Sequence, residues 1–119
     1  MEEKIWHQHY DPGVSPTLEY PPYPVDHFLQ KTAEEFPNHP ATIFGGMAPA
    51  VGEQHSTLTY TQLNNSVNRF AAGLQQAGLQ KGDRVALYLP NCPQMVIAYY
   101  GVLRAGGIVV NSNPLYVAR

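Results

Sequence analysis

Histidine and cysteine are the side chains of this 119-residue chain best suited to bind a metal ion or to attack a substrate. His7 and His9 are close together but fall in a proline-rich stretch, while His27, His39 and His55 are scattered. The usual zinc-binding spacings, His-Glu-x-x-His and paired Cys-x-x-Cys, are absent from the sequence. We therefore interpret the histidines as exposed or capping residues and predict no metal site.

Cys92 is the single cysteine, and it falls near the start of a predicted helix, a position that can favour the reactive thiolate. A nucleophilic cysteine also needs a base nearby, and the local sequence offers none. We interpret Cys92 as a small residue at a helix start. One cysteine cannot form an intramolecular disulfide, which fits a reducing compartment. The first ten residues begin acidic and lack an apolar core, so they do not resemble a signal peptide, and we predict a cytoplasmic protein.

Phosphate-binding loops are also absent, because the sequence contains neither Gly-x-Gly-x-x-Gly nor Gly-x4-Gly-Lys-Ser/Thr. The turn Pro90–Pro93, where a nucleotide-binding unit often carries such a loop, has no glycine and no charge. Met95, Tyr99 and Tyr100 could line an apolar ligand tunnel, but on such an apolar helix they are more typical of a core. We assign no catalytic, cofactor-binding or metal-binding residue within this chain.

The elements around that turn form the clearest pattern of the sequence. Arg84–Leu89 is nearly apolar throughout, which is typical of a strand buried on both faces of a parallel sheet. Asn91 or Cys92 is expected to cap a helix that has Pro93 in its first turn and ends at Gly106-Gly107. Ile108–Asn111 is a second short apolar strand. This order predicts a strand–helix–strand unit with parallel strands.

Two further helices and a hairpin are predicted before this unit. In Val25–Phe36, apolar residues recur at helical spacing, and Asp26 in the first turn suits the helix dipole. Thr59 and Gln62 form a capping box for a helix over Tyr60–Ala77, and Gly78 fits its left-handed end. The two stripes predicted to face the core are Phe28, Leu29, Ala33 and Phe36 in the first helix, and Leu63, Val67, Phe70, Ala71 and Leu74 in the second. Residues 41–46 and 56–60 are predicted to pair as strands.

Composition and proline distribution define the organisation of the chain. Residues 1–24 hold five of the eleven prolines and are interpreted as an extended arm anchored by aromatics; a disordered tail or a proline-rich ligand motif are the alternatives. Residues 25–119 form the folded part. Charged residues make up 13% of the chain against about 25% in an average soluble domain. This deficit indicates that other protein normally covers part of the surface.

The fold class that follows is α/β, as an incomplete parallel strand–helix–strand piece of a larger domain, truncated at its C-terminal end. Two apolar parallel strands need helices on both faces and further strands at their edges. If these remain uncovered, we expect copies of the chain to associate as a homo-oligomer. The net charge of −2 gives no strong attraction to nucleic acid or to an anionic membrane, and no apolar run reaches the roughly 18 residues of a spanning helix. A peripheral contact with a membrane remains open.

Residues 58–116 resemble the N-terminal region of adenylate-forming acyl-CoA synthetases, a superfamily that includes firefly-luciferase-like enzymes and the adenylation domains of peptide synthetases. "KGDRVALYLPN" followed by a helix and "AGG" is specific to this superfamily, and "VVNSNPLY" is similar to its long-chain fatty acid branch. The arm and "VDHFLQKTAEEFPNHPAT" resemble the front of bacterial long-chain fatty acid–CoA ligases, whereas the loop "GGMAPAVGEQHS" is longer than usual. The matching positions are Leu58, Thr59, Tyr60, Leu63, Asn68, Arg69, Ala71, Ala72, Leu74, Gly78, Lys81–Ala86, Leu89–Asn91, Leu103–Gly106, Asn113 and Pro114.

The resemblance implies a parent enzyme that joins a fatty acid to CoA with ATP and magnesium, releasing AMP and pyrophosphate. The family's phosphate loop, adenine pocket and catalytic lysine would all lie downstream, so none is carried onto a residue of this chain, and the 119 residues alone are expected to be inactive scaffold. Two alternatives remain open: another adenylate-forming enzyme acting on aryl or amino acids, or a stand-alone, non-catalytic α/β interaction module.

Overall fold

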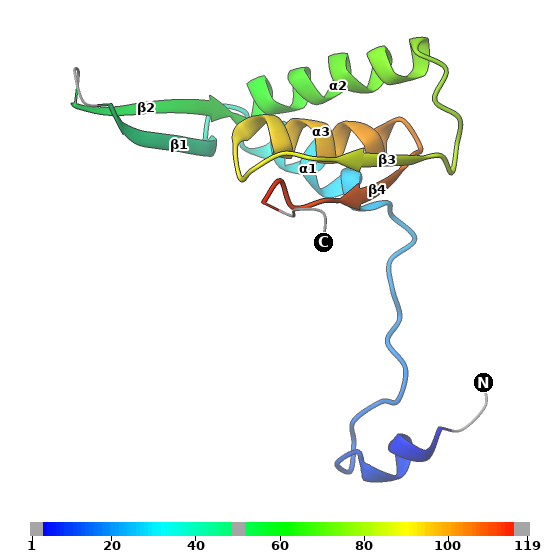
Figure 1. The fold of residues 1–119 in the computed structure, drawn as a ribbon. Coiled ribbons are helices and arrows are strands. Elements are labelled where there is room, and N and C mark those ends of the chain that lie inside the picture. The colour runs from blue at the N-terminus through cyan, green and yellow to red at the C-terminus, as the bar shows by residue number, and fades with distance from the viewer. Residues whose placement is uncertain (1–3, 49–51, 116–119) are drawn as a thin grey trace.

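The computed structural model describes residues 4–48 and 52–115. A layer of helices covers one side of a pair of strands, a hairpin projects from one end, and the N-terminal segment leads away from the body (Figure 1). The element bounds are η1 (Ile5–His9), α1 (Val25–Glu35), β1 (Pro40–Ala48), β2 (Gly52–Thr59), α2 (Tyr60–Gln76), β3 (Arg84–Leu87), α3 (Pro93–Arg104) and β4 (Ile108–Asn111).

The predicted strand–helix–strand unit is present as β3–α3–β4. β3 and β4 pair in parallel, with Arg84 opposite Ile108 and Leu87 opposite Asn111. Cys92 is the N-cap residue of α3, and Pro93 follows in the first turn, where its missing N–H costs no helical hydrogen bond. Gly106 ends the helix with φ of 89°, a conformation that favours glycine. The strand prediction was too long at its end, because β3 stops at Leu87.

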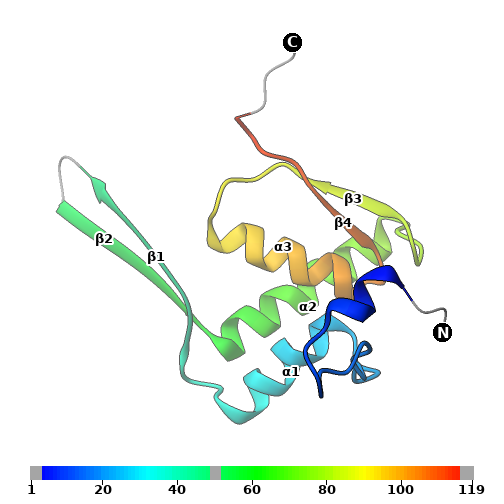
Figure 2. The same ribbon diagram turned by 90° about the horizontal axis from the view of Figure 1, so that it is seen from below.

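Helix α3 is apolar on most sides because it packs between two hydrophobic clusters. On one side Val96, Ile97 and Tyr100 pack against Leu29 of α1 and the buried residues of α2. On the other side Ala98 and Val102 pack with Leu87 of β3. Figures 1 and 2 show α3 between α2 and the two strands. The helix therefore shields only one face of the strand pair.

Helix α2 begins and ends as the sequence predicts. Thr59 Oγ1 accepts a hydrogen bond from the Gln62 backbone N–H, and Gln62 Oε1 accepts one from the Thr59 backbone N–H. Gly78 follows the helix with φ of 98°. Leu63, Val67 and Ala71 form its buried face, whereas Phe70, which was predicted to be buried with them, lies at the edge and is 37% exposed.

Close packing of α2 against α3 depends on a glycine. A Cβ at Gly101 would come within 2.6 Å of Phe70 Cδ1 and within 3.3 Å of Phe70 Cβ. The absence of a side chain on α3 therefore lets the Phe70 ring lie directly against the helix backbone.

Helix α1 is held by an ion pair as well as by its apolar face. Asp26 is 3% exposed, and both of its carboxylate oxygens accept hydrogen bonds from Arg104 at the end of α3. The role predicted for Asp26, an interaction with the helix dipole, missed this partner. Leu29 and Ala33 are buried as predicted, but Phe28 and Phe36 are 54% and 46% exposed, so the prediction that they face the core was wrong.

The predicted hairpin is present, and it is longer than the pattern indicated. β1 pairs with β2 antiparallel from Pro40 opposite Thr59 to Ala48 opposite Gly52. At its base Ala41 packs against the core cluster that contains Leu63 and Val67 of α2, whereas Ile43 and Phe44 further along β1 are 69% and 47% exposed. Most of this two-stranded sheet therefore has no protein covering it among the described residues.

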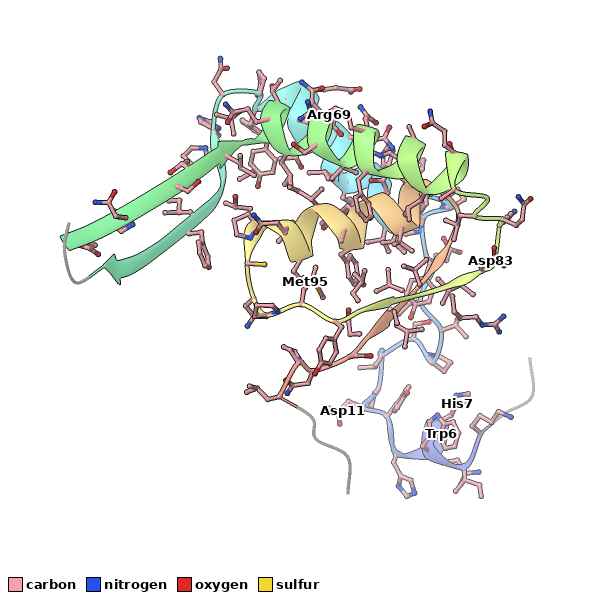
Figure 3. All side chains as sticks on the ribbon, turned by 45° about the horizontal axis from the view of Figure 1, so that its top comes forward. Trp6, His7, Asp11, Arg69, Asp83 and Met95 are labelled. Carbon is pink, nitrogen blue, oxygen red and sulfur yellow. The ribbon has the colours of Figure 1, made fainter. Side chains whose placement is uncertain are left out.

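The N-terminal segment contains the 3-10 helix η1, which the proline pattern did not predict, and a turn in which the Val14 backbone N–H donates to the Asp11 carbonyl oxygen. Trp6 and His7 on η1 lie away from the helices (Figure 3). Residues 10–24 are exposed along their length. Parts of several predictions lie outside the described residues: the first three residues of the arm, residues 49–51 of the long loop, and residues 116–119 at the end of the predicted folded part.

None of the helices in residues 4–48 and 52–115 is long and apolar enough to cross a membrane. The two parallel strands remain partly uncovered. Ile108 and Val110 are 46% and 42% exposed although they alternate along β4 on one face, opposite Val109, which packs in the core cluster. These strands thus carry apolar residues on both faces, as predicted, but only one face is buried among the described residues.

Candidate functional site

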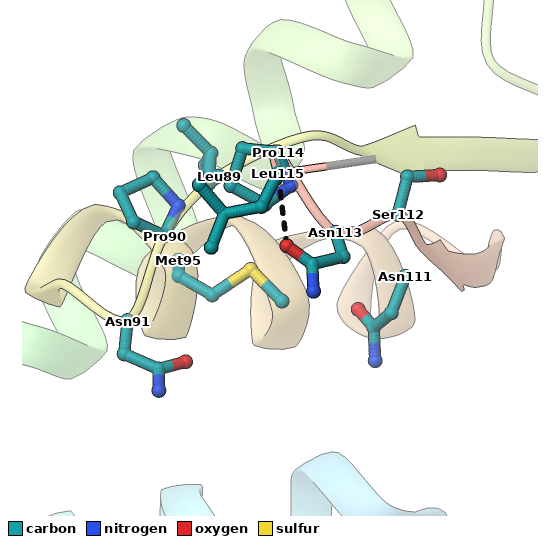
Figure 4. A pocket seen from close by; sticks show the side chains of 9 residues that line it. All are labelled: Leu89, Pro90, Asn91, Met95, Asn111, Ser112, Asn113, Pro114 and Leu115. Atoms are coloured by element: carbon teal, nitrogen blue, oxygen red, sulfur yellow. Dashed lines mark hydrogen bonds between the residues drawn. The ribbon is translucent and has the colours of Figure 1, made fainter. Parts of the chain in front are cut away.

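A recess at the parallel strands lies where both strands end. Ligands of open α/β sheets bind in such a crevice at the carboxyl ends of strands. The residues after β3, the first turn of α3 and the residues after β4 enclose a cleft of about 610 Å³ (Figure 4). Its lining residues are Leu89, Pro90, Asn91, Met95, Asn111, Ser112, Asn113, Pro114 and Leu115.

Uncharged polar groups and apolar side chains share the walls of this cleft. The Asn113 carboxamide oxygen accepts a hydrogen bond from the Leu115 backbone N–H at 2.9 Å, which shapes the turn after β4. The Tyr88 hydroxyl donates to the Pro114 carbonyl oxygen at 2.8 Å and ties the two strand ends together. None of the nine lining residues is charged. The cleft can form hydrogen bonds through the carboxamides of Asn91 and Asn111, but it offers no general base, nucleophile or cation.

The histidines are dispersed over the described residues. His27 stacks on Tyr23 and His39 stacks on Phe36, with ring centroids 4.4 and 5.3 Å apart. His55 Nε2 lies 3.3 Å from a Glu53 carboxylate oxygen. The backbone N–H of Lys4 donates to His7 Nδ1 at 3.2 Å. In the part of the chain that the structure describes, no three His, Cys, Asp or Glu residues are grouped as a metal ion would require.

The remaining candidate residues from the sequence lie either in the core or in a recess at the surface. Tyr99 and Tyr100 contact each other edge to face, Tyr99 in the cluster next to β3 and Tyr100 in the cluster next to α1 and α2. They belong to the core, the reading that the sequence favoured. Met95 also packs in the core, yet it lines the cleft described above and a second recess beside β1. Cys92 is half-buried in that second recess, at the start of α3.

Sequence reasoning missed the grouping around Arg104. Besides the Asp26 carboxylate, its guanidinium donates to Asn68 Oδ1 at 2.6 Å and to the Asn64 backbone carbonyl oxygen at 3.3 Å. This joins residues from α1, α2 and α3. Asn68 and Arg104 were both noted as family-like positions, but only the structure shows that they contact each other and that Asp26 is the partner of Arg104.

The geometry defines a scaffold of the α/β class, and the cleft at the ends of its parallel strands has no reactive group. The family described as AMP-binding enzyme matches residues 29–119, and the chain belongs to this family. The chain is 44% identical over 116 residues to a long-chain-fatty-acid–CoA ligase of Bacillus subtilis and 43% identical over 119 residues to that of Haemophilus influenzae, with 98% of this chain aligned in each case. An acetyl-coenzyme A synthetase of Pseudoalteromonas translucida is 44% identical over 84 residues, or 71% of the chain.

These relatives are much longer than this chain, which spans 19%, 20% and 12% of their lengths. Among solved structures, the N-terminal subdomain of NpsA from Klebsiella oxytoca aligns over 79% of the chain and 22% of its own, with a TM-score of 0.69 and 26% identity. The fatty acid AMP ligase of Legionella pneumophila aligns over 79% of this chain and 16% of its own, with the same TM-score and 28% identity. The predicted family and α/β fold are thus confirmed.

Proposed function

We propose that residues 1–119 are the leading part of a long-chain fatty acid–CoA ligase, which converts a fatty acid, ATP and CoA into acyl-CoA, AMP and pyrophosphate. The observation that carries this proposal is the 44% identity with the Bacillus subtilis long-chain-fatty-acid–CoA ligase over 98% of the chain. The role of the segment is to supply scaffold: β3–α3–β4 contributes two parallel strands and their covering helix, and α1 and α2 brace that helix.

The described residues do not fit a site for ATP and magnesium. A triphosphate needs cations or a row of backbone N–H groups, and magnesium needs carboxylate or phosphate oxygens. The cleft at the strand ends provides only carboxamides, a hydroxyl and apolar groups. No reaction step is therefore derived through ATP, magnesium or CoA in this segment, and the catalytic, cofactor-binding and metal-binding residues of the ligase are proposed to lie outside it.

The alternative of another adenylate-forming enzyme has a specific observation in its favour. The fold is shared with the NpsA subdomain, which has been solved in complex with 3-hydroxyanthranilyl-AMSN, so the fold alone does not select a fatty acid. The proposal of a long-chain ligase is supported by 43–44% identity over 98% of the chain, whereas the acetyl-coenzyme A synthetase reaches 44% over 71% of the chain and NpsA 26% over 79%. An interaction module without catalytic parts remains a third possibility.

The test is a pyrophosphate-release assay on the protein as its gene encodes it, with long-chain fatty acids, short-chain acids, aryl acids and amino acids as substrates. We expect release that depends on ATP and magnesium with long-chain fatty acids, and acyl-CoA as the product once CoA is added. Release with aryl or amino acids alone would favour the second alternative. No release with any acid would favour the interaction module.

The organisation proposed for the chain follows the structure of its parts. We propose a boundary after residue 24, because α1 begins at Val25 and the residues before it are exposed. A cytoplasmic location, a homo-oligomeric state and peripheral contact with the membrane that holds the fatty acid are proposed together with the ligase activity. Support for oligomerisation comes from the uncovered apolar residues of β1 and β4.

A further inference from the structure

A second recess, of about 360 Å³, lies between the hairpin and the start of α3, and it is predominantly apolar. One wall consists of three consecutive residues of β1, the hairpin strand nearer to α3, and the other of the first turn of α3 and the residues before it (Figure 2). The lining residues are Thr42, Ile43, Phe44, Asn91, Cys92, Pro93, Met95 and Val96, and we call this recess the β1 recess. Small-molecule sites are usually apolar concavities of about 300–1,000 Å³ with a few polar groups. The β1 recess therefore has the size and the character of such a site.

The N-terminal end of α3 forms part of the β1 recess. Cys92, the N-cap residue, makes no side-chain hydrogen bond to the first turn, which leaves helical N–H groups there without a capping acceptor. Such N–H groups and the positive end of the helix dipole attract an anion. No acidic side chain lines the recess to repel one, and the Asn91 carboxamide beside Cys92 adds two further N–H donors. This end of the recess therefore favours a negatively charged group.

A buried hydroxyl on the opposite wall gives independent evidence of a ligand. Thr42 Oγ1 is inaccessible to solvent and makes no hydrogen bond with any described residue. Buried polar atoms nearly always have a partner, and one that has none points to a water or a ligand. Thr42 lines the recess, so rotation about its χ1 angle turns the hydroxyl toward the recess, where it can donate to an acceptor. A ligand that carries an anionic acceptor would satisfy this hydroxyl and the start of α3 together.

We propose that the β1 recess binds an aliphatic monocarboxylate. Its carboxylate lies at the start of α3 and accepts a hydrogen bond from the Thr42 hydroxyl. Its chain lies between the apolar side chains of the two walls, which are Ile43 and Phe44 of β1 and Met95 and Val96 of α3. The lining residues include no general base, so this is a binding site and not a reaction centre. The proposal does not rest on the ligase activity, because it is argued from the walls of the recess alone.

The volume of the recess sets the chain length of the ligand. An apolar cavity of about 150 Å³ holds benzene, so in proportion about 360 Å³ holds roughly a dozen carbons. Each methylene that is fully removed from water raises the affinity by a factor of about four. We therefore expect dodecanoate to bind at least tenfold more tightly than octanoate, which has a shorter chain and the same head group.

Cys92, the only cysteine of the chain, lines the β1 recess, so its reactivity measures whether the recess is occupied. The rate at which iodoacetamide alkylates the Cys92 thiol is measured on the 119-residue chain, with dodecanoate kept below its critical micelle concentration. A bound chain covers the thiol, so dodecanoate should slow alkylation at least fivefold, whereas octanoate at the same concentration should have little effect. Dodecylamine has the same chain and a positive head group, which the start of α3 repels, so it should not protect the thiol. Neither ATP nor CoA is present, so the result is independent of the pyrophosphate-release assay that tests the ligase activity.

Variants of the β1 wall test the head-group and chain contacts separately. Thr42→Val removes the hydroxyl at nearly constant shape and should weaken dodecanoate binding about tenfold in calorimetry, without lowering the free energy of unfolding. Ile43→Asp changes a side chain that is 69% exposed, so the fold should tolerate it, and the new charge on the wall should abolish protection of Cys92. Leu115→Asp is the matched control, because Leu115 is 83% exposed and does not line the β1 recess. It should leave protection intact.

Four results would overturn the proposal. An unchanged alkylation rate in dodecanoate would show that the recess stays empty, and equal protection by dodecylamine would show that the carboxylate is not recognised. Protection that persists in Ile43→Asp, or several dodecanoate molecules bound per chain in calorimetry, would show detergent-like binding elsewhere on the protein. Wild-type affinity in Thr42→Val would show that the hydroxyl does not contact the ligand, and the proposed position of the carboxylate would be wrong.

Discussion

Removing the Asp26 carboxylate tests whether one ion pair holds the three helices together. The Arg104 and Asp26 side chains are 13% and 5% exposed, and their two hydrogen bonds measure 2.8 and 2.9 Å. Asp26→Ala leaves the Arg104 guanidinium with only Asn68 and a backbone carbonyl as partners. Because an uncompensated buried charge is left behind, we expect the free energy of unfolding to fall by about 3–5 kcal/mol. A typical domain has about 5–15 kcal/mol in total.

The assay is urea denaturation followed by far-ultraviolet circular dichroism, with the free energy of unfolding extrapolated to water. A second variant separates the charge from the packing: Asp26→Leu combined with Arg104→Met removes both charges and keeps apolar volume. Replacing both members of a buried pair is often neutral or stabilising, so the double variant should be clearly more stable than Asp26→Ala. Glu35→Ala is the control. It breaks an exposed pair with Lys31, 3.7 Å apart, and should change stability by less than about 1 kcal/mol.

Two results would refute this reasoning. A loss below about 1 kcal/mol for Asp26→Ala would show that water reaches Arg104 and replaces the carboxylate, as it does for surface pairs. A double variant as unstable as the single one would show that the pair contributes through packing of the side-chain stems rather than through charge. Either result would remove the charge of Arg104 as the link between α1 and α3.

Three further outcomes are expected. Gly101→Ala should destabilise the protein by about 1–3 kcal/mol because its Cβ would overlap Phe70. Gly73→Ala, whose Cβ would have nothing within 4 Å, should instead stabilise α2 by about 0.5–1 kcal/mol. Equal shifts of the two variants in thermal unfolding would show that the Gly101–Phe70 contact is unimportant. Thr59→Ala should cost about 1 kcal/mol in the same assay through the lost helix cap, and an unchanged midpoint would contradict this. The 119-residue chain should show no micromolar ATP binding by calorimetry because the cleft is uncharged, and a measurable heat of saturable binding would contradict the assignment of scaffold.

Features encoded by neighbouring residues were predictable from the sequence. The capping box of Thr59 and Gln62, the end of α3 at Gly106 and the parallel strand order each depend on fewer than about thirty consecutive residues. The physical rules behind them, hydrogen-bond satisfaction at helix ends and the φ preference of glycine, act locally. The family resemblance came from the same local motifs and extended the prediction to function.

Features that join distant segments were not predictable. Asp26 and Arg104 are 78 positions apart, and nothing near Asp26 distinguishes a helix-dipole residue from the partner of a buried arginine. Phe28 and Phe36 satisfy the helical spacing of the core stripe, yet they are about half exposed. Helical periodicity predicts which face of a helix turns toward the core, but not how much of that face the neighbouring elements cover. The cleft at the strand ends was also missed, since none of its residues carries a charge.

The small core and the extended shape of the chain explain why its uncovered strands matter. Its radius of gyration is 19.3 Å, against about 14 Å for a compact domain of this length. Both the hairpin and the N-terminal segment project from the body (Figure 1). Among the described residues, the fully or nearly buried hydrophobic side chains larger than alanine are Leu29, Leu63, Val67, Leu87 and Val102. Ile43 and Phe44 of β1 and Ile108 and Val110 of β4 remain largely exposed, so these two strands are where additional protein would bury further apolar surface.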